Sequence, residues 1–203
     1  AKEGKKVVRL KNGDPSIFSR LSQELDALVK NRIEFEIVPG VTAASATSSF
    51  SGIPLTDRRF ASSCVFVTGH EDPKKLESAL DPSTSLRVNG ERSRTIDWDS
   101  LAKRGTLVLY MAVENLKKIV NELIKAGKDK DTPVAIVQDA SLLTQKISSG
   151  TLKDIAKKAL AQKIRPPAII IIGETVELKK DFNWLNKNKR ILFTGLSKER
   201  FFI

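Results

Sequence analysis

The chain has 203 residues, with 35 lysines and arginines against 24 aspartates and glutamates, giving a net charge of +11 and a pI near 9.8. Its 40% hydrophobic and 29% charged residues indicate a soluble globular protein, and no apolar run approaches the about 20 residues that span a bilayer. One cysteine, Cys64, excludes an internal disulfide, and with a single histidine it cannot build a typical zinc site. We expect no metal, no membrane partner and a cytoplasmic location.

The positive charge fits either a lysine-rich solvated surface or the attraction of a polyanion. Aromatic residues make up 6% of the chain and are not interleaved with the basic residues as a base-stacking platform requires. We therefore expect no nucleic-acid partner. Charge alone does not separate a solvated surface from the binding of a polyanionic small molecule.

The first part of the chain predicts two short strands, residues 7–10 and 34–38, joined by an amphipathic helix. Apolar residues keep helical spacing between these strands: Phe18, Leu21, Leu25, Leu28 and Val29. Residues 42–50 are rich in Ala, Ser and Thr, which predicts a helix packed closely against a neighbour.

The second part predicts further alternation of strands and helices. The strands are expected at residues 63–67, 107–110, 134–137 and 168–172. Asn115 is a candidate N-cap and Gly127 a candidate C′ residue of one helix, and Thr151 with Asp154 approximates a capping box before another. The alternation indicates the α/β class. Residues 82–94 are polar and predict an inserted loop.

We place a domain boundary near Asp57. Residues 1–57 are expected to be the C-terminal part of one domain, residues 58–180 a second domain, and residues 181–203 a tail or the start of a further domain.

Three segments place Gly, Pro or small polar residues directly after β-branched apolar runs: residues 7–18 (VVRLKNGDPSIF), 38–44 (VPGVTAA) and 52–58 (GIPLTDR). In open α/β sheets, ligands bind outside the carboxyl ends of the strands, so these loops predict one small-molecule crevice. In this order and spacing the segments resemble the uroporphyrinogen-III C-methyltransferases, members of the tetrapyrrole methylases. The resemblance continues through residues 68–70 (TGH), 106–111 (TLVLYM), 133–137 (PVAIV), 150–152 (GTL) and 165–173 (RPPAIIIIG).

The resemblance covers roughly residues 1 to 180. It implies a tetrapyrrole methylase-like fold of two unequal α/β domains, the N-terminal one incomplete, because the family's glycine-rich loop and its proton-transfer residues would precede residue 1. It also implies S-adenosyl-L-methionine as the methyl donor, a tetrapyrrole substrate with eight carboxylates, and a homodimer. We expect the complete protein to be active and this chain alone to be inactive. A uroporphyrinogen-III synthase sometimes follows the methylase in this family, and residues 189–194 resemble its first strand weakly.

By resemblance, Asn12, Gly13, Asp14 and Ile17 match the loop that holds the methionine end of the donor. Thr42 and Ala43 match a second contact, Met111 lines the adenine pocket, and Ala140 takes the place of a family glycine. Without the family, Gly13 could simply close a turn, Asp14 could cap a helix and Met111 could fill core. The catalytic residues stay unknown.

The chain departs from the family pattern at the loops. Asn12 replaces a glycine, residues 19–24 (SRLSQE) and 139–141 (DAS) differ from the usual strings, and Asp57 replaces a histidine before Arg58. These changes leave alternatives open: a later precorrin, a diphthamide precursor or ribosomal RNA as substrate, or a non-catalytic binding domain.

Overall fold

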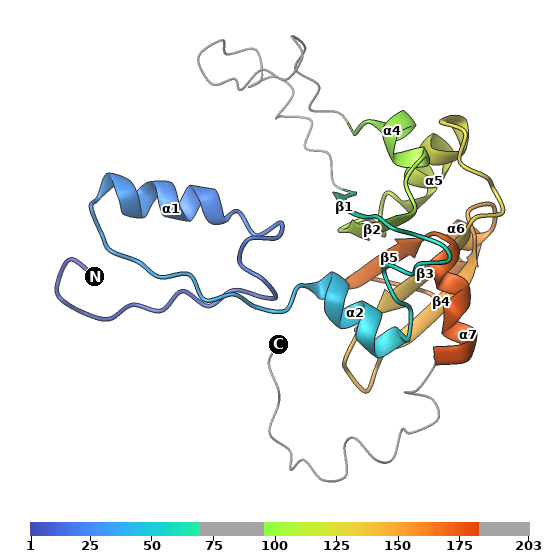
Figure 1. Ribbon diagram of the computed structural model, residues 1–203. Helices are drawn as coiled ribbons and strands as arrows, with labels where there is room; N and C mark the ends of the chain where they lie inside the picture. Colours follow the sequence, from blue (N-terminus) through green and yellow to red (C-terminus); the bar gives the residue numbers. More distant parts are fainter. Residues whose placement is uncertain (70–95, 183–203) are drawn as a thin grey trace.

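The computed structural model describes residues 1–69 and 96–182. Its centre is a mixed five-stranded sheet in the order β1-β2-β5-β3-β4 (Figure 1). The strands are β1 (Cys64–Thr68), β2 (Thr106–Tyr110), β3 (Pro133–Gln138), β4 (Lys146–Thr151) and β5 (Ala168–Ile172). β1 and β2 run parallel, and every other neighbouring pair is antiparallel. The predicted α/β class and its four predicted strands in residues 63–172 are confirmed.

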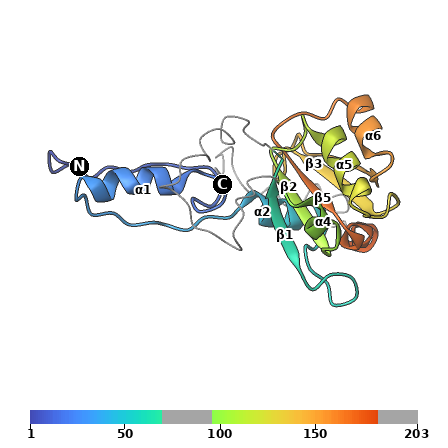
Figure 2. The ribbon, with the colours of Figure 1, turned by 90° about the horizontal axis from the view of Figure 1, so that it is seen from above.

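Helices cover both faces of the sheet (Figures 1 and 2). The helices are α1 (Leu21–Lys30), α2 (Ala43–Ser51), α4 (Trp98–Ala102), α5 (Leu116–Lys125), α6 (Ile155–Ala161), the 3-10 helix η3 (Glu174–Leu178) and α7 (Lys179–Phe182). α4, α5 and α6 lie on one face, and α2 lies on the other. None of the helices in these two ranges has the length and apolarity of a membrane span.

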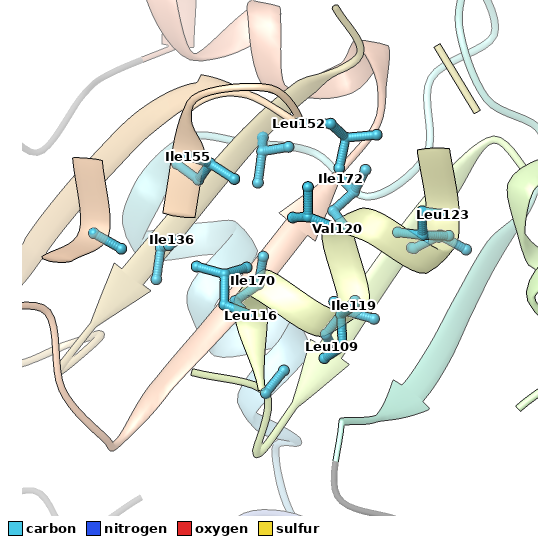
Figure 3. Close-up of a cluster of buried hydrophobic side chains, with 14 of the residues drawn as sticks. Leu109, Leu116, Ile119, Val120, Leu123, Ile136, Leu152, Ile155, Ile170 and Ile172 are labelled. Atoms are coloured by element: carbon cyan, nitrogen blue, oxygen red, sulfur yellow. The ribbon is translucent and has the colours of Figure 1, made fainter. Parts of the chain in front are cut away.

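The sheet separates two buried clusters because successive side chains of a strand point to opposite faces. Leu107 and Leu109 of β2 pack beneath α5, while Val108 and Tyr110 of the same strand face α2. In β5, Ile170 and Ile172 belong to the cluster beneath α5, and Ile169 and Ile171 belong to the cluster that faces α2. The larger cluster, shown in Figure 3, also takes in Leu116, Ile119, Val120 and Leu123 of α5 and Leu152 and Ile155 beside α6. Central strands buried on both faces explain the continuous apolar runs TLVLY and AIIII.

α5 begins and ends at the residues that the sequence predicts, but the side chain of its N-cap does not cap it. Gly127 is the C′ residue, with φ of +88°, a conformation that costs glycine little. Asn115 occupies the N-cap, but its side chain makes no cap hydrogen bond; Nδ2 donates instead to the Gly69 carbonyl at 2.8 Å. Asn115 therefore ties the end of β1 to the start of α5.

Only half of the predicted capping box forms before α6. Asp154 is the N-cap and its Oδ1 accepts the Thr151 amide at 2.8 Å, whereas the buried Thr151 hydroxyl has no hydrogen-bond partner. The helix begins one residue after the aspartate, so Thr151 is too far upstream to cap it.

The strands predicted at residues 7–10 and 34–38 are wrong. Both segments are extended but carry no strand, and Val7, Val8 and Leu10 are 67%, 73% and 80% exposed. A strand needs a hydrogen-bonded neighbour, and within the described residues neither segment has one. The helix between them forms as α1, but none of its residues is buried. Figures 1 and 2 show these residues reaching away from the sheet.

Four of the described elements had no sequence prediction: the short helices α4, η3 and α7, and the edge strand β4, whose KISSGT lacks an apolar alternation. The proposed inserted loop, residues 82–94, lies outside the described residues. The boundary near Asp57 stays a prediction. Ala44 and Ile53, which precede it, are buried in one cluster with Val108 and Ile171, which follow it. Cys64 is half-buried against that cluster, and burial raises the pKa of its thiol, as suits a small core residue.

Candidate functional site

The turn at Asp14 is joined to the segment before α2 through one carboxylate. Oδ1 of Asp14 accepts the Ser16 amide at 2.8 Å and the Ser16 hydroxyl, while Oδ2 accepts the Gly40 amide at 3.1 Å. The bonds from the Ser16 hydroxyl and amide, followed by that from Gly40, lower the pKa of Asp14 below its usual value. The ionised side chain therefore holds two distant loop segments together.

Two glycines allow these segments to approach closely. Gly13 has φ of +67°, in the left-handed region, and a Cβ on Gly40 would stand 2.3 Å from the Gly13 carbonyl oxygen. No side chain fits at residue 40 without moving one loop. Asn12 does not have a positive φ. The positive φ of this turn is at Gly13 instead.

Lys11 fixes the other side of the turn. Its ammonium group donates to the Ser19 carbonyl at 2.6 Å and to Glu24 Oε2 at 2.6 Å. The bond from Lys11 is the main cause that lowers the pKa of Glu24. Since Glu24 lies in α1, the helix and the Asp14 turn are held as one unit.

The start of α2 is joined to the end of β2 by Tyr110. The Tyr110 hydroxyl lies 2.6 Å from Thr42 Oγ1 and accepts the Ala44 amide at 3.0 Å. The Tyr110 ring also contacts Phe18 and Phe66, with ring centroids 4.9 and 5.8 Å away. Thr42, the N-cap of α2, makes no cap hydrogen bond with its own side chain.

A pocket of about 410 Å³ lies between the Asp14 turn and α2. Its lining is mixed, with apolar surface from three side chains and polar groups from four. The lining residues are Asp14, Ser16, Ile17, Gly40, Val41, Thr42, Ser45 and Phe66. Among the described residues, no lysine or arginine belongs to this lining, so a ligand in the pocket has no direct contact with a basic side chain there.

Met111 and Ala140 lie at two further strand ends. Met111 directly follows β2, with φ of +52° and 56% of its surface exposed, so it does not fill core. Ala140 follows β3, between Asp139 (φ +51°) and Ser141 (φ +74°). Neither residue lines the pocket, and neither do Asn12 and Ala43. Four of the eight expected contacts, Gly13, Asp14, Ile17 and Thr42, meet at or beside the pocket.

The loop that carries Ala140 is attached to α2. Gln145 Oε1 accepts the Ser141 amide at 3.0 Å, and Gln145 Nε2 donates to the Phe50 carbonyl at 3.0 Å. Among the described residues, no three His, Cys, Asp or Glu side chains form a group that could hold a metal ion.

Comparison with known proteins then assigns the family. Residues 1–156 match the Tetrapyrrole (Corrin/Porphyrin) Methylases. The chain belongs to the tetrapyrrole methylase family. It is 45% identical over 179 residues to the S-adenosyl-L-methionine-dependent uroporphyrinogen III methyltransferase of Methanosarcina barkeri, covering 88% of this chain and 64% of that protein. It is 42% identical over 188 residues to the siroheme synthase of Actinobacillus pleuropneumoniae serotype 3, covering 92% of this chain and 35% of that protein.

Solved tetrapyrrole methylase structures share the fold. The uroporphyrin-III C-methyltransferase of Thermus thermophilus, complexed with S-adenyl homocysteine, is 32% identical with a TM-score of 0.65, covering 85% of this chain and 67% of that one. A cobalt precorrin-4 methyltransferase is 27% identical with a TM-score of 0.70, covering 86% and 66%. The expected tetrapyrrole methylase-like fold is confirmed. The chain spans about two thirds of the Methanosarcina relative and about a third of the siroheme synthases.

The sequence reasoning missed five residues that line the pocket, together with Tyr110 behind it: Ser16, Gly40, Val41, Ser45 and Phe66. Ser16 follows the Asp14-Pro15 pair at the two-residue spacing of an Asx turn, a signal that was available. Tyr110 precedes Met111 in the strand TLVLY, where its position resembles a core residue. Only the fold reveals that its hydroxyl reaches Thr42.

Proposed function

We propose that the protein transfers methyl groups from S-adenosyl-L-methionine to two ring carbons of uroporphyrinogen III, yielding precorrin-2 for sirohaem or cobalamin. The observation that carries the proposal is the pocket between the Asp14 turn and α2 in a chain 32% identical to a methyltransferase structure that holds S-adenyl homocysteine. The uroporphyrinogen III methyltransferase of Methanosarcina barkeri, at 45% identity, supports the choice of substrate.

The pocket suits a molecule of the donor's kind. Its volume of about 410 Å³ falls within the range of small-molecule sites, roughly 300–1,000 Å³. Ile17, Val41 and Phe66 offer apolar surface, while Thr42 and Ser45 offer hydroxyl groups. Such a lining can bury a flat apolar group and orient it through a few polar contacts.

The donor supplies a methyl group bonded to a positively charged sulfur, and the chain's task is to hold it in line with the accepting carbon. In this proposal Asn12, Gly13, Asp14 and Ile17 hold the amino-acid end, and Thr42 and Ala43 form a second contact. Met111 lines the adenine pocket, and Ala140 is a further contact of the donor. Orientation of this kind supplies about 7–11 kcal/mol of a barrier. The hydrogen bond that Asp14 accepts from the Gly40 amide and the one that Gln145 donates to the Phe50 carbonyl fix the loops before the ligand arrives.

The wider assignments belong to the same proposal. We infer a division into domains near Asp57, a homodimer, a cytoplasmic location, a tetrapyrrole as the binding partner and no nucleic acid. The low aromatic content, 6%, supports the exclusion of a base-stacking surface. Sedimentation velocity of the whole natural protein tests the dimer, and a single monomeric boundary at high concentration contradicts it.

The deciding experiment measures transfer of labelled methyl groups by the whole natural protein to enzymatically made uroporphyrinogen III. We expect a dimethylated product whose mass corresponds to precorrin-2. A later precorrin, a diphthamide precursor and ribosomal RNA serve as competing acceptors. Methylation of one of these in preference to uroporphyrinogen III contradicts the proposal, and so does an absence of transfer to any acceptor.

A further inference from the structure

Tyr110 lies where the loops of the candidate site meet. It is the last residue of β2 and is 8% exposed, and its ring contacts both Phe18, which follows the Asp14 turn, and Phe66 of β1. Because Phe66 also lines the pocket, the tyrosine is packed directly behind the pocket wall. A ring held by two aromatic contacts places its hydroxyl at a fixed point.

The hydrogen bonds of that hydroxyl determine where its proton goes. The Ala44 amide can only donate, so at 3.0 Å it occupies a lone pair of the Tyr110 oxygen. Either oxygen could donate in the 2.6 Å pair of Tyr110 and Thr42 Oγ1. Because a phenol is a better donor than acceptor, we infer that Tyr110 donates its proton to Thr42 Oγ1. Thr42 Oγ1 then accepts from Tyr110, and its own hydrogen remains free to donate elsewhere.

The arrangement also changes the usual role of a threonine N-cap. Such a residue normally uses its side-chain oxygen to accept an amide from the second or third residue of the helix. In α2 the second residue is Ala44, and its amide is taken by Tyr110 instead. Thr42 is thereby released from capping, and it lines the pocket.

We propose that Tyr110 is a positioning residue that caps α2 in place of Thr42 and directs the Thr42 hydroxyl to donate a hydrogen bond to an acceptor atom of the bound methyl donor. The inference rests on the proposed function, since it takes S-adenosyl-L-methionine as the ligand. Tyr110 acts through Thr42 and does not itself contact the ligand.

The test measures binding of S-adenosylhomocysteine to the whole natural protein by calorimetry. Tyr110→Phe keeps the ring and removes the hydroxyl, Thr42→Val removes the proposed donor, and Thr42→Ser keeps it. Thr175→Val is the matched control: Thr175 is fully buried and its hydroxyl lies 3.4 Å from that of Thr106, at the opposite end of β2. Melting temperatures are recorded for every variant.

We expect Tyr110→Phe and Thr42→Val each to weaken binding about three- to tenfold, in line with the loss of one net hydrogen bond. Thr42→Ser should keep more affinity than Thr42→Val, because it retains the hydroxyl, and Thr175→Val should bind like the wild type while lowering the melting temperature. In the Thr42→Val background, Tyr110→Phe should add little. In turnover, Tyr110→Phe should raise KM for the methyl donor more than it lowers kcat.

Wild-type affinity of Tyr110→Phe for S-adenosylhomocysteine overturns the inference. So does a loss of affinity on Tyr110→Phe that is as large in the Thr42→Val background as in the wild type. If Tyr110→Phe does not fold, the Thr42 pair decides: equal affinity of Thr42→Val and Thr42→Ser rejects the donor role. These failures leave the proposed function standing. A wild-type protein that binds no S-adenosylhomocysteine removes the proposed function and the inference together.

Discussion

Asp14 connects two loop segments through backbone amides, and this contact gives its substitution a specific consequence. Asp14→Ala removes the bonds to Ser16 and Gly40 and should weaken S-adenosylhomocysteine binding roughly tenfold, because the pocket wall loses its fixed geometry. Asp129→Ala is the control, since Asp129 accepts the Asp131 amide at 2.9 Å in a comparable turn away from the pocket. Calorimetry compares the two, and equal affinities contradict a role for Asp14 in the site.

The pH dependence of the same residue has a definite sign. The folded-state pKa of Asp14 is lowered, so its contribution to stability is present above the unfolded pKa of about 3.9 and is lost as pH falls through the lower folded value. The stability difference between wild type and Asp14→Asn should therefore shrink below about pH 4. Urea unfolding from pH 2.5 to 7 measures it, and a difference that grows on acidification contradicts the assignment.

Gly40 tests how closely the two loop segments must approach. A methyl group at residue 40 would overlap the Gly13 carbonyl, so Gly40→Ala should destabilise the fold by about 1–3 kcal/mol and weaken ligand binding. Gly127→Ala has open space around the new Cβ and a φ of +88°, so it should cost about 1 kcal/mol with binding unchanged. If the two variants bind the ligand with comparable affinity, the close approach of the two loop segments is not what requires glycine at residue 40.

At the scale of elements, the strand predictions were confirmed for buried segments and wrong for exposed ones. The strands TLVLY and PVAIVQ are buried along their whole length, and their apolar composition reflects this position inside the sheet. Residues 7–10 and 34–38 have the same β-branched character without a paired neighbour, and composition cannot supply the partner that a strand needs. β4 is the opposite case: it pairs with β3 over six residues, although its side chains are mainly small and polar.

The loop after β3 depends on one glutamine. Gln145→Ala should release the segment that carries Ala140 from α2 and weaken S-adenosylhomocysteine binding about three- to tenfold, because two hydrogen bonds to backbone groups are lost. Gln145→Glu keeps the acceptor for Ser141 and should show a smaller loss. Gln162→Ala, at an exposed position after α6, serves as control. Calorimetry giving one affinity for all three variants contradicts a role for this loop.

At the scale of the whole molecule, the candidate site was partly readable because Gly13, Asp14 and Thr42 lie in short motifs after predicted strands. The rest of the site depends on contacts between residues far apart in sequence. Tyr110 reaches Thr42 across 68 positions and Gln145 reaches Phe50 across 95, and no local pattern indicates either pair. The position of the basic residues relative to the pocket could not be predicted either, because composition gives only the net charge.

The charge leads to a prediction that separates the two ligands. The net charge of +11 gives the molecule a positive field, and the described residues that line the pocket include no lysine or arginine that could contact the donor directly. An acceptor with eight carboxylates should be attracted by that field, whereas the methyl donor should depend on short contacts. Raising the salt concentration shortens the screening length from about 10 Å at 0.1 M to about 3 Å at 1 M. KM for uroporphyrinogen III should therefore rise several-fold over this range.

S-adenosylhomocysteine provides the internal control for this experiment, because hydrogen bonds and apolar contacts in a pocket are screened far less than charges at the surface. Its affinity, measured in the same buffers, should change by less than the KM of the tetrapyrrole. Potassium chloride and potassium glutamate should give the same trend if screening is the cause, since chloride binding alone would affect only the first. Equal salt dependence for both ligands, or none for the tetrapyrrole, would show that the excess lysine and arginine serve only to solvate the surface.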